Sequence, residues 1–264
     1  MIASRAICGN HMIHTEDQAP LPSKLREEVI VDAIFEIRFS GNDGLADLLP
    51  GMIWPIFDSA ATVHRLPVAD IPSQVRKVEQ ELIYLPTVKL ESGNYSIFAG
   101  DRVFAVGVKL PYRGWDDFKN FIVLALNRIN SIDLIGRIER YSLKYVNFLP
   151  DRLLSEPEKS LDWNILVAGK PQFGLAAALK STFRADGLMI IREISTALNM
   201  VLNGNDLGQG TVISVDSLSD VAEPAVLQNI LAEVLENLEK HHKQCKDLFF
   251  ECISRGALLE LGAE

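Results

Sequence analysis

The chain has 264 residues, of which 48% are hydrophobic and 23% charged, and its formal net charge is −9. This length and composition are typical of a globular protein with a sizeable core. The acidic balance disfavours binding to duplex nucleic acid, which usually requires a basic surface. No apolar run approaches the ~18 residues that a membrane-spanning helix needs, and residues 1–10 lack the apolar core of a secretory signal. We therefore expect a cytoplasmic protein that does not enter the membrane.

The first ordered element is expected near residue 28. Residues 1–24 show no periodicity and are predicted to form a mobile leader. Apolar and polar residues then alternate over 28–39, which predicts a long strand with one apolar face. Residues 40–44 resemble a turn, and 45–57 a short helix limited by its prolines.

A meander and a helix follow in the sequence. Strands are predicted over 82–90, 95–98 and 103–110. A helix with acidic residues in its first turn is predicted over 114–129, and another strand over 139–149.

These patterns divide the chain into two units. We predict an α+β unit over residues 25–150, a connector over 151–172 and a second α+β unit over 173–264. The second unit begins with a hairpin whose strands span 175–184 and 188–202 around an Asp-Gly turn.

The second unit ends in a long amphipathic helix. A glycine-rich loop over 204–210 and a strand over 211–218 precede it, and the helix is predicted to begin at Pro224 and to stop at Gly256. Such a helix is roughly 45 Å long, so it should line a large sheet, reach a second subunit, or both. The predicted fold class is α+β, with antiparallel strands in one large or two smaller sheets packed on helices.

Three segments carry a resemblance to a known family. They are the strand Val-Asp-Ala-Ile-Phe-Glu-Ile-Arg-Phe at 31–39, the strand Tyr-Ser-Leu-Lys-Tyr-Val-Asn at 141–147 and the end of the last helix at 242–253. In these segments the chain resembles a family of uncharacterised proteins distributed sporadically in bacteria, over most of residues 22–255. The resemblance implies a bacterial cytoplasmic protein of unknown activity. The sporadic distribution of the family would fit an accessory role, such as genome defence or an antitoxin-like partner. It supplies no catalytic residues.

One cluster has the residue types of a metal site. His241 and Cys245 are four residues apart and share a helix face, with His242 and Cys252 nearby. The chain offers no second pair of ligands at suitable spacing, because His11, His14, His64 and Cys8 lie in the leader and a loop. We therefore predict no metal and no cofactor, and we assign His241 and Cys245 to the apolar stripe of the helix.

No catalytic motif stands out. The loop 204–210 lacks the Lys-Ser/Thr ending of a phosphate-binding loop, and Ser195 and Ser214 lie on predicted strands without a Gly-x-Ser-x-Gly elbow. The leading hypothesis is a non-enzymatic binding or interaction protein that self-associates as a homodimer, with an unknown protein partner as a further prediction.

Two other hypotheses name residues. The first is an enzyme or small-ligand-binding protein with an apolar cleft between sheet and helix. Its polar candidates are His64, Arg140, Tyr145, Asn147 and His242. The second is a nucleic-acid-linked defence component that uses basic strand residues, namely Arg140, Lys144, Lys180, Arg184 and Arg192.

Overall fold

The computed structural model describes residues 21–40, 45–57, 61–132, 135–163, 165–171 and 176–264. Most of the predicted leader and nearly all of the predicted turn at 40–44 lie outside the described residues. The end of the leader is paired with the other end of the chain. The backbone N–H of Glu264 donates to the carbonyl oxygen of Lys24 at 3.0 Å.

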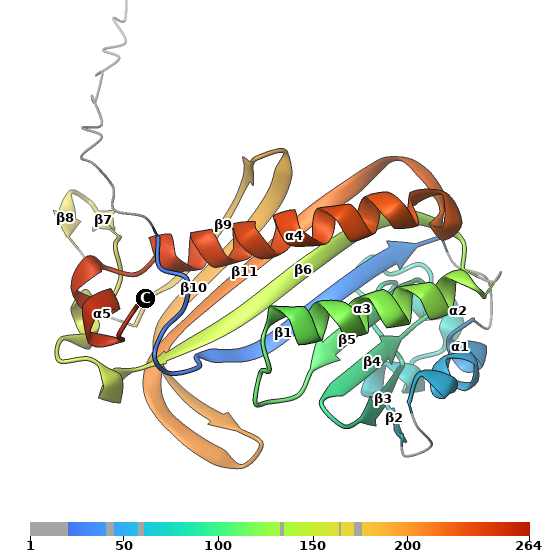
Figure 1. Cartoon of the computed structure of the whole chain (residues 1–264), viewed down its shortest axis with the longest axis horizontal. Helices are drawn as coiled ribbons and strands as arrows, with labels where there is room; N and C mark the ends of the chain where they lie inside the picture. The colour runs from blue at the N-terminus through green and yellow to red at the C-terminus, as the bar shows by residue number, and fades with distance from the viewer. Residues whose placement is uncertain (1–20, 41–44, 58–60, 133–134, 164, 172–175) are drawn as a thin grey trace, which may run out of the picture.

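The described strands form one large antiparallel sheet of nine strands, in the order β2-β3-β4-β5-β1-β6-β11-β10-β9 (Figure 1). These strands are β1 (Ile30–Phe39), β2 (Thr62–Arg65), β3 (Val88–Ser92), β4 (Tyr95–Ala99), β5 (Val103–Val108), β6 (Arg137–Pro150), β9 (Ala178–Ala185), β10 (Leu188–Leu202) and β11 (Asn205–Val226). A separate pair, β7 (Leu166–Val167) and β8 (Lys170–Pro171), lies outside this sheet. The molecule is α+β, as predicted, and strands of both predicted units share one sheet.

The strand order has an approximate two-fold symmetry about the central pair β1 and β6. On one side of this pair lie β5, β4 and β3, and on the other lie β11, β10 and β9. Each meander leads into a long helix, α3 (Trp115–Asn130) after β5 and α4 (Leu227–Glu251) after β11. The connectivity of strand, meander and helix therefore occurs twice, and among the described strands β2 has no counterpart.

Both long helices lie along the same face of the sheet (Figure 1). The register pairs Phe35 with Leu143 and Ile37 with Tyr141, and these four side chains are buried beneath the helices. The buried face of α4 consists of Leu227, Ile230, Val234, Leu238, His241, Cys245, Leu248, Phe249 and Phe250. Because α4 packs on its own sheet, its length no longer requires a second subunit.

The remaining helical segments are short. They are α1 (Leu45–Ile53), η1 (Trp54–Ile56), η2 (Pro67–Asp70), α2 (Ser73–Arg76), η3 (Asp151–Leu153), η4 (Pro157–Lys159) and α5 (Arg255–Glu260). In the described ranges, every helix is too short or too polar to cross a membrane.

The ends of the last helix differ from the prediction. Pro224 lies in β11, which pairs with β6 as far as Val226, so α4 begins at Leu227. The helix ends at Glu251 instead of continuing to Gly256. Ser254 then caps α5 by accepting a hydrogen bond from the backbone N–H of Ala257 at 3.3 Å, which places Gly256 inside a new helix.

Two other predicted boundaries change. The strand predicted over 82–90 begins only at Val88, because the backbone N–H of Ile83 bonds back to the Glu79 carbonyl at 3.0 Å. The predicted glycine-rich loop is paired strand from Asn205 onwards. Asn203 and Gly204 have φ values of 51° and 81°, which allow a two-residue hairpin turn between β10 and β11.

Candidate functional site

A cavity of 440 Å³ lies between the last turns of α4, the start of α3 and the segment that leads into β1. We call it the aromatic pocket. Its ring-bearing lining residues are Tyr112, Trp115, Tyr145, His242, Phe249 and Phe250. The helix-facing side of β6 directs Tyr145 towards α4, where His242 and Lys246 are one turn apart.

A chain of hydrogen bonds runs through the pocket. The hydroxyl oxygens of Tyr112 and Tyr145 are 3.1 Å apart, and the Tyr145 hydroxyl lies 3.2 Å from His242 Nδ1. Nε2 of His242 forms no hydrogen bond within the described part of the chain. The chain therefore ends in two groups that a ligand can reach, the Tyr112 hydroxyl and His242 Nε2.

Trp115 fixes the plane of the imidazole. Its ring stacks on that of His242 with centroids 4.3 Å apart and an interplanar angle of 5°. The indole N–H donates to Glu239 Oε2 at 2.9 Å, one turn before His242 on α4. This contact joins the start of α3 to α4 and holds one wall of the pocket.

Burial keeps the hydrogen-bonded groups uncharged. It lowers the pKa of His242 to about 4, an effect to which the nearby charge of Lys246 adds. It also raises the pKa of Tyr112 to about 12 and the pKa of Tyr145 well above its usual value. At neutral pH the chain therefore consists of two phenols and a neutral imidazole.

Cys245 lies at the base of the pocket as a buried thiol. Its Sγ is 3.3 Å from the Leu143 carbonyl oxygen. Burial raises the thiol pKa well above its usual value. Because the thiolate is the nucleophilic form, this residue is not activated for covalent chemistry.

Three of the five polar residues singled out in the sequence meet in this pocket. Tyr145, Asn147 and His242 line it together, although residues 147 and 242 are far apart in the sequence. The Asn147 amide donates to the Ile213 carbonyl at 3.3 Å, which orients its side chain. Tyr112 and Trp115 complete the site but were missed in the sequence. An available signal was the spacing of three aromatic residues, Tyr112, Trp115 and Phe118, at the start of the predicted helix.

The other two candidates, His64 and Arg140, lie elsewhere. Arg140 is paired in register with Arg38, on the face of the sheet opposite the helices, and its Nη2 is 3.5 Å from Glu36 Oε1. His64 on β2 lies 3.3 Å from Glu91 Oε2. Each side chain lies beside a glutamate of the neighbouring strand, and neither lines the aromatic pocket.

The five basic residues proposed for nucleic-acid contact do not form one patch. Lys144 is opposite Asp216, and Arg140 is opposite Asp220 in the register of β6 and β11. Lys180 forms an ion pair with Glu193 at 2.6 Å. Arg192 points to the other face, where its guanidinium lies 5.2 Å from the Phe183 ring centroid. Acidic residues thus alternate with the basic ones across the face of the sheet opposite the helices, which we call the open face.

Asp216, on the open face, carries a carboxylate whose charged form is destabilised by burial. Burial raises the pKa of Asp216 to about 6, and its Oδ1 accepts no hydrogen bond among the described residues. A raised carboxyl pKa means that stability is lost as pH rises from about 4 to about 6. We expect Asp216→Asn to increase the free energy of unfolding at pH 7.5 by up to about 3 kcal/mol and to give no increase at pH 4.

Urea denaturation at the two pH values measures this difference. Asp220→Asn is the control, because Asp220 is exposed on the same strand. An equal effect of Asp216→Asn at both pH values would contradict the assignment.

The His and Cys residues of the last helix that were considered as metal ligands are not arranged as a metal site. Within the described ranges, no group of three or more His, Cys, Asp or Glu residues is arranged to hold a metal ion. His241 is buried between α4 and the sheet, where its Nδ1 is 2.8 Å from Ser217 Oγ and its Nε2 is 3.1 Å from Ser219 Oγ. His241 thus links α4 to β11, as part of the buried face of the helix.

Comparison with other proteins adds no family assignment. Neither the known protein families nor the curated proteins include a match to this chain.

Proposed function

We propose that the protein binds a small, uncharged and largely apolar molecule in the aromatic pocket. The cavity volume lies within the range of about 300–1,000 Å³ that is typical of small-molecule sites. Aromatic and aliphatic side chains form its inner walls, and charged residues of the segment before β1, together with Lys246, complete the lining. An enzyme reading has less support, because Cys245 is a protonated, buried thiol.

The hydrogen-bond chain is the observation that carries this proposal. If Tyr145 donates to Nδ1 of the neutral imidazole, His242 Nε2 carries the proton and becomes a donor for the ligand. If Nδ1 is the donor instead, the chain reverses, Nε2 accepts and the Tyr112 hydroxyl is free to donate. Either polarity presents one donor and one acceptor, which matches an uncharged polar group of a ligand.

The test is native mass spectrometry of the purified protein and of Tyr145→Phe. This substitution removes the central hydroxyl of the chain and keeps the ring. We expect the unaltered protein to carry an excess mass that disappears on denaturation. Occupancy by the same molecule should fall about fivefold in Tyr145→Phe, which corresponds to roughly 1 kcal/mol for one hydrogen bond.

Tyr84→Phe provides the matched control. The Tyr84 hydroxyl donates to Glu139 Oε2 at 2.7 Å, outside the aromatic pocket, so its loss should leave the occupancy unchanged. Equal occupancy in all three proteins would place the ligand outside the aromatic pocket. A native mass equal to that of the chain alone would contradict the proposal.

A broader interaction role is the second candidate, and it includes self-association. Val201 is 67% exposed and Leu198 is 42% exposed near the end of the β10–β11 hairpin, which projects beyond the helices (Figure 1). Exposed apolar side chains on a projecting hairpin favour contact with another protein surface. The proposal of a bacterial, cytoplasmic protein with an accessory or defence-linked role rests on the resemblance alone.

A further inference from the structure

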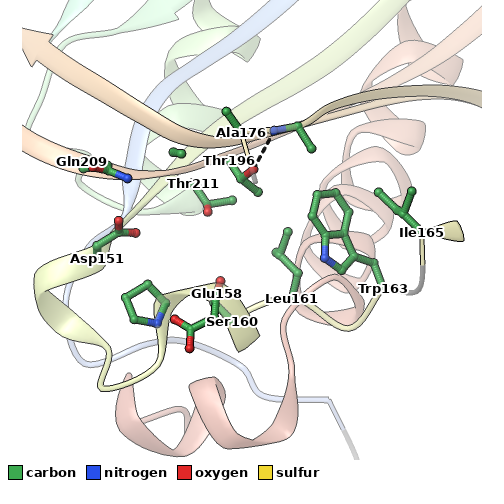
Figure 2. A pocket seen from close by; sticks show the side chains of 13 residues that line it. Asp151, Glu158, Ser160, Leu161, Trp163, Ile165, Ala176, Thr196, Gln209 and Thr211 are labelled. Atoms are coloured by element: carbon green, nitrogen blue, oxygen red, sulfur yellow. Dashed lines mark hydrogen bonds between the residues drawn. The ribbon is translucent and has the colours of Figure 1, made fainter. Parts of the chain in front are cut away.

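A second cavity, of 480 Å³, lies between the segment that follows β6 and the strands β10 and β11. The segment with η3 and η4 forms one side, and strands β10 and β11 contribute the other. Figure 2 shows Asp151 and Glu158 towards one end of this cavity, and Leu161 and Trp163 towards the other. One end of the cavity is therefore acidic and the other apolar.

Two buried hydroxyl groups point into the same space. Ser160 is 2% exposed and Thr211 is 4% exposed, and both line the cavity. Neither hydroxyl forms a hydrogen bond to another group in the described part of the chain. Both oxygens are accessible from the cavity, so they are available to a ligand.

Among the described residues, neither Asp151 nor Glu158 forms an ion pair within 4.0 Å. The neighbouring basic residues are directed to other acids, because Arg152 lies 4.0 Å from Glu27 and Lys159 is paired with Glu156. Burial raises the pKa of Asp151, and the negative charge of Glu158 adds to this effect. A cation placed between Asp151 and Glu158 would relieve their mutual repulsion.

We propose that this cavity binds a small organic cation, consisting of a primary ammonium group on an apolar or aromatic tail. An ammonium group has three N–H donors and no acceptor, which matches two carboxylates and two unpaired hydroxyls. The tail would pack on Leu161 and on the ring of Trp163 at the apolar end of the cavity. The site is separate from the aromatic pocket and shares no lining residue with it.

Isothermal titration calorimetry with phenethylamine tests this proposal, with 2-phenylethanol as the neutral analogue of the same shape. We expect phenethylamine to bind at least tenfold more tightly than the alcohol. Glu158→Gln, at an exposed position that should tolerate the change, is expected to weaken phenethylamine binding at least tenfold, and Asp151→Asn should do the same.

Asp162→Asn is the matched control, because it removes the same charge from an exposed residue outside the cavity lining. It should leave the affinity within twofold of the unaltered protein, as should Tyr145→Phe. Absence of phenethylamine binding, equal binding of amine and alcohol, or equal losses in Glu158→Gln and Asp162→Asn would overturn the proposal. Because 2-phenylethanol also belongs to the ligand class proposed for the aromatic pocket, binding that Tyr145→Phe weakens and Glu158→Gln leaves unchanged would be assigned to that pocket.

Discussion

Leu238→Ala is expected to lower the free energy of unfolding by about 3 kcal/mol, within the usual range for a buried leucine. Leu238 has 0% exposure and lies on the buried face of α4. Removal of its side chain leaves a cavity between the helix and the sheet, which the paired strands beneath it cannot close. Urea denaturation monitored by circular dichroism at pH 7 measures the loss.

Leu259→Ala is the control for this substitution. Leu259 is also in a helix but is 75% exposed, so its replacement should change the free energy of unfolding by less than about 0.5 kcal/mol. Equal effects at the two positions would contradict the packing of α4 on its own sheet.

Gly210→Ala is expected to destabilise the fold by about 3 kcal/mol or more, at the upper end of the range for overpacked sites. A Cβ atom at this position would lie 2.3 Å from the Leu149 carbonyl oxygen and 2.6 Å from the Phe148 ring. The carbonyl belongs to the backbone of β6, so relief of the clash requires two paired strands to separate. Thermal and urea denaturation should both show the loss.

Gly256→Ala separates this clash from the general effect of a glycine substitution. No atom lies within 4 Å of a Cβ built at Gly256, which is in α5. Alanine there should be neutral or stabilising by up to about 1 kcal/mol, because it is the better helix former. Loss of stability at Gly256 and none at Gly210 would contradict the close approach of β11 to β6.

Elements with a strong hydrophobic period could be predicted from the sequence. Alternation over residues 30–39 indicated β1, and the spacing from Phe118 to Ile129 indicated α3. Boundaries set by tertiary pairing could not be predicted in this way. Pro224 is a favourable first residue for a helix, yet the pairing of β11 with β6 on both sides of it keeps it extended.

One local signal was present but misinterpreted. Asn203-Gly204 is the dipeptide most typical of a two-residue hairpin turn. The glycines at 208 and 210 suggested a loop, although Gly208 has a φ of 78° beside a register irregularity and Gly210 allows close packing of two strands. Both glycines therefore belong to the paired strand β11 and not to a loop.

The candidate site was only partly accessible to sequence reasoning. Tyr145 and Asn147 are two residues apart on one strand and so share a face, whereas Arg140 is an odd number of residues from both and points to the opposite face. The alternation of side chains along β6 is thus enough to place Arg140 on the face opposite the other two. Tyr112 and Trp115 join the site through the contact of α3 with α4, which no local pattern shows.

The most direct test of ligand binding in the aromatic pocket is a crystal structure of the protein as purified, without dialysis. We predict electron density for a small molecule within hydrogen-bonding distance of His242 Nε2 or the Tyr112 hydroxyl, with its apolar part against the aromatic walls. A pocket that holds only ordered water, or is closed by its own side chains, would contradict the proposal.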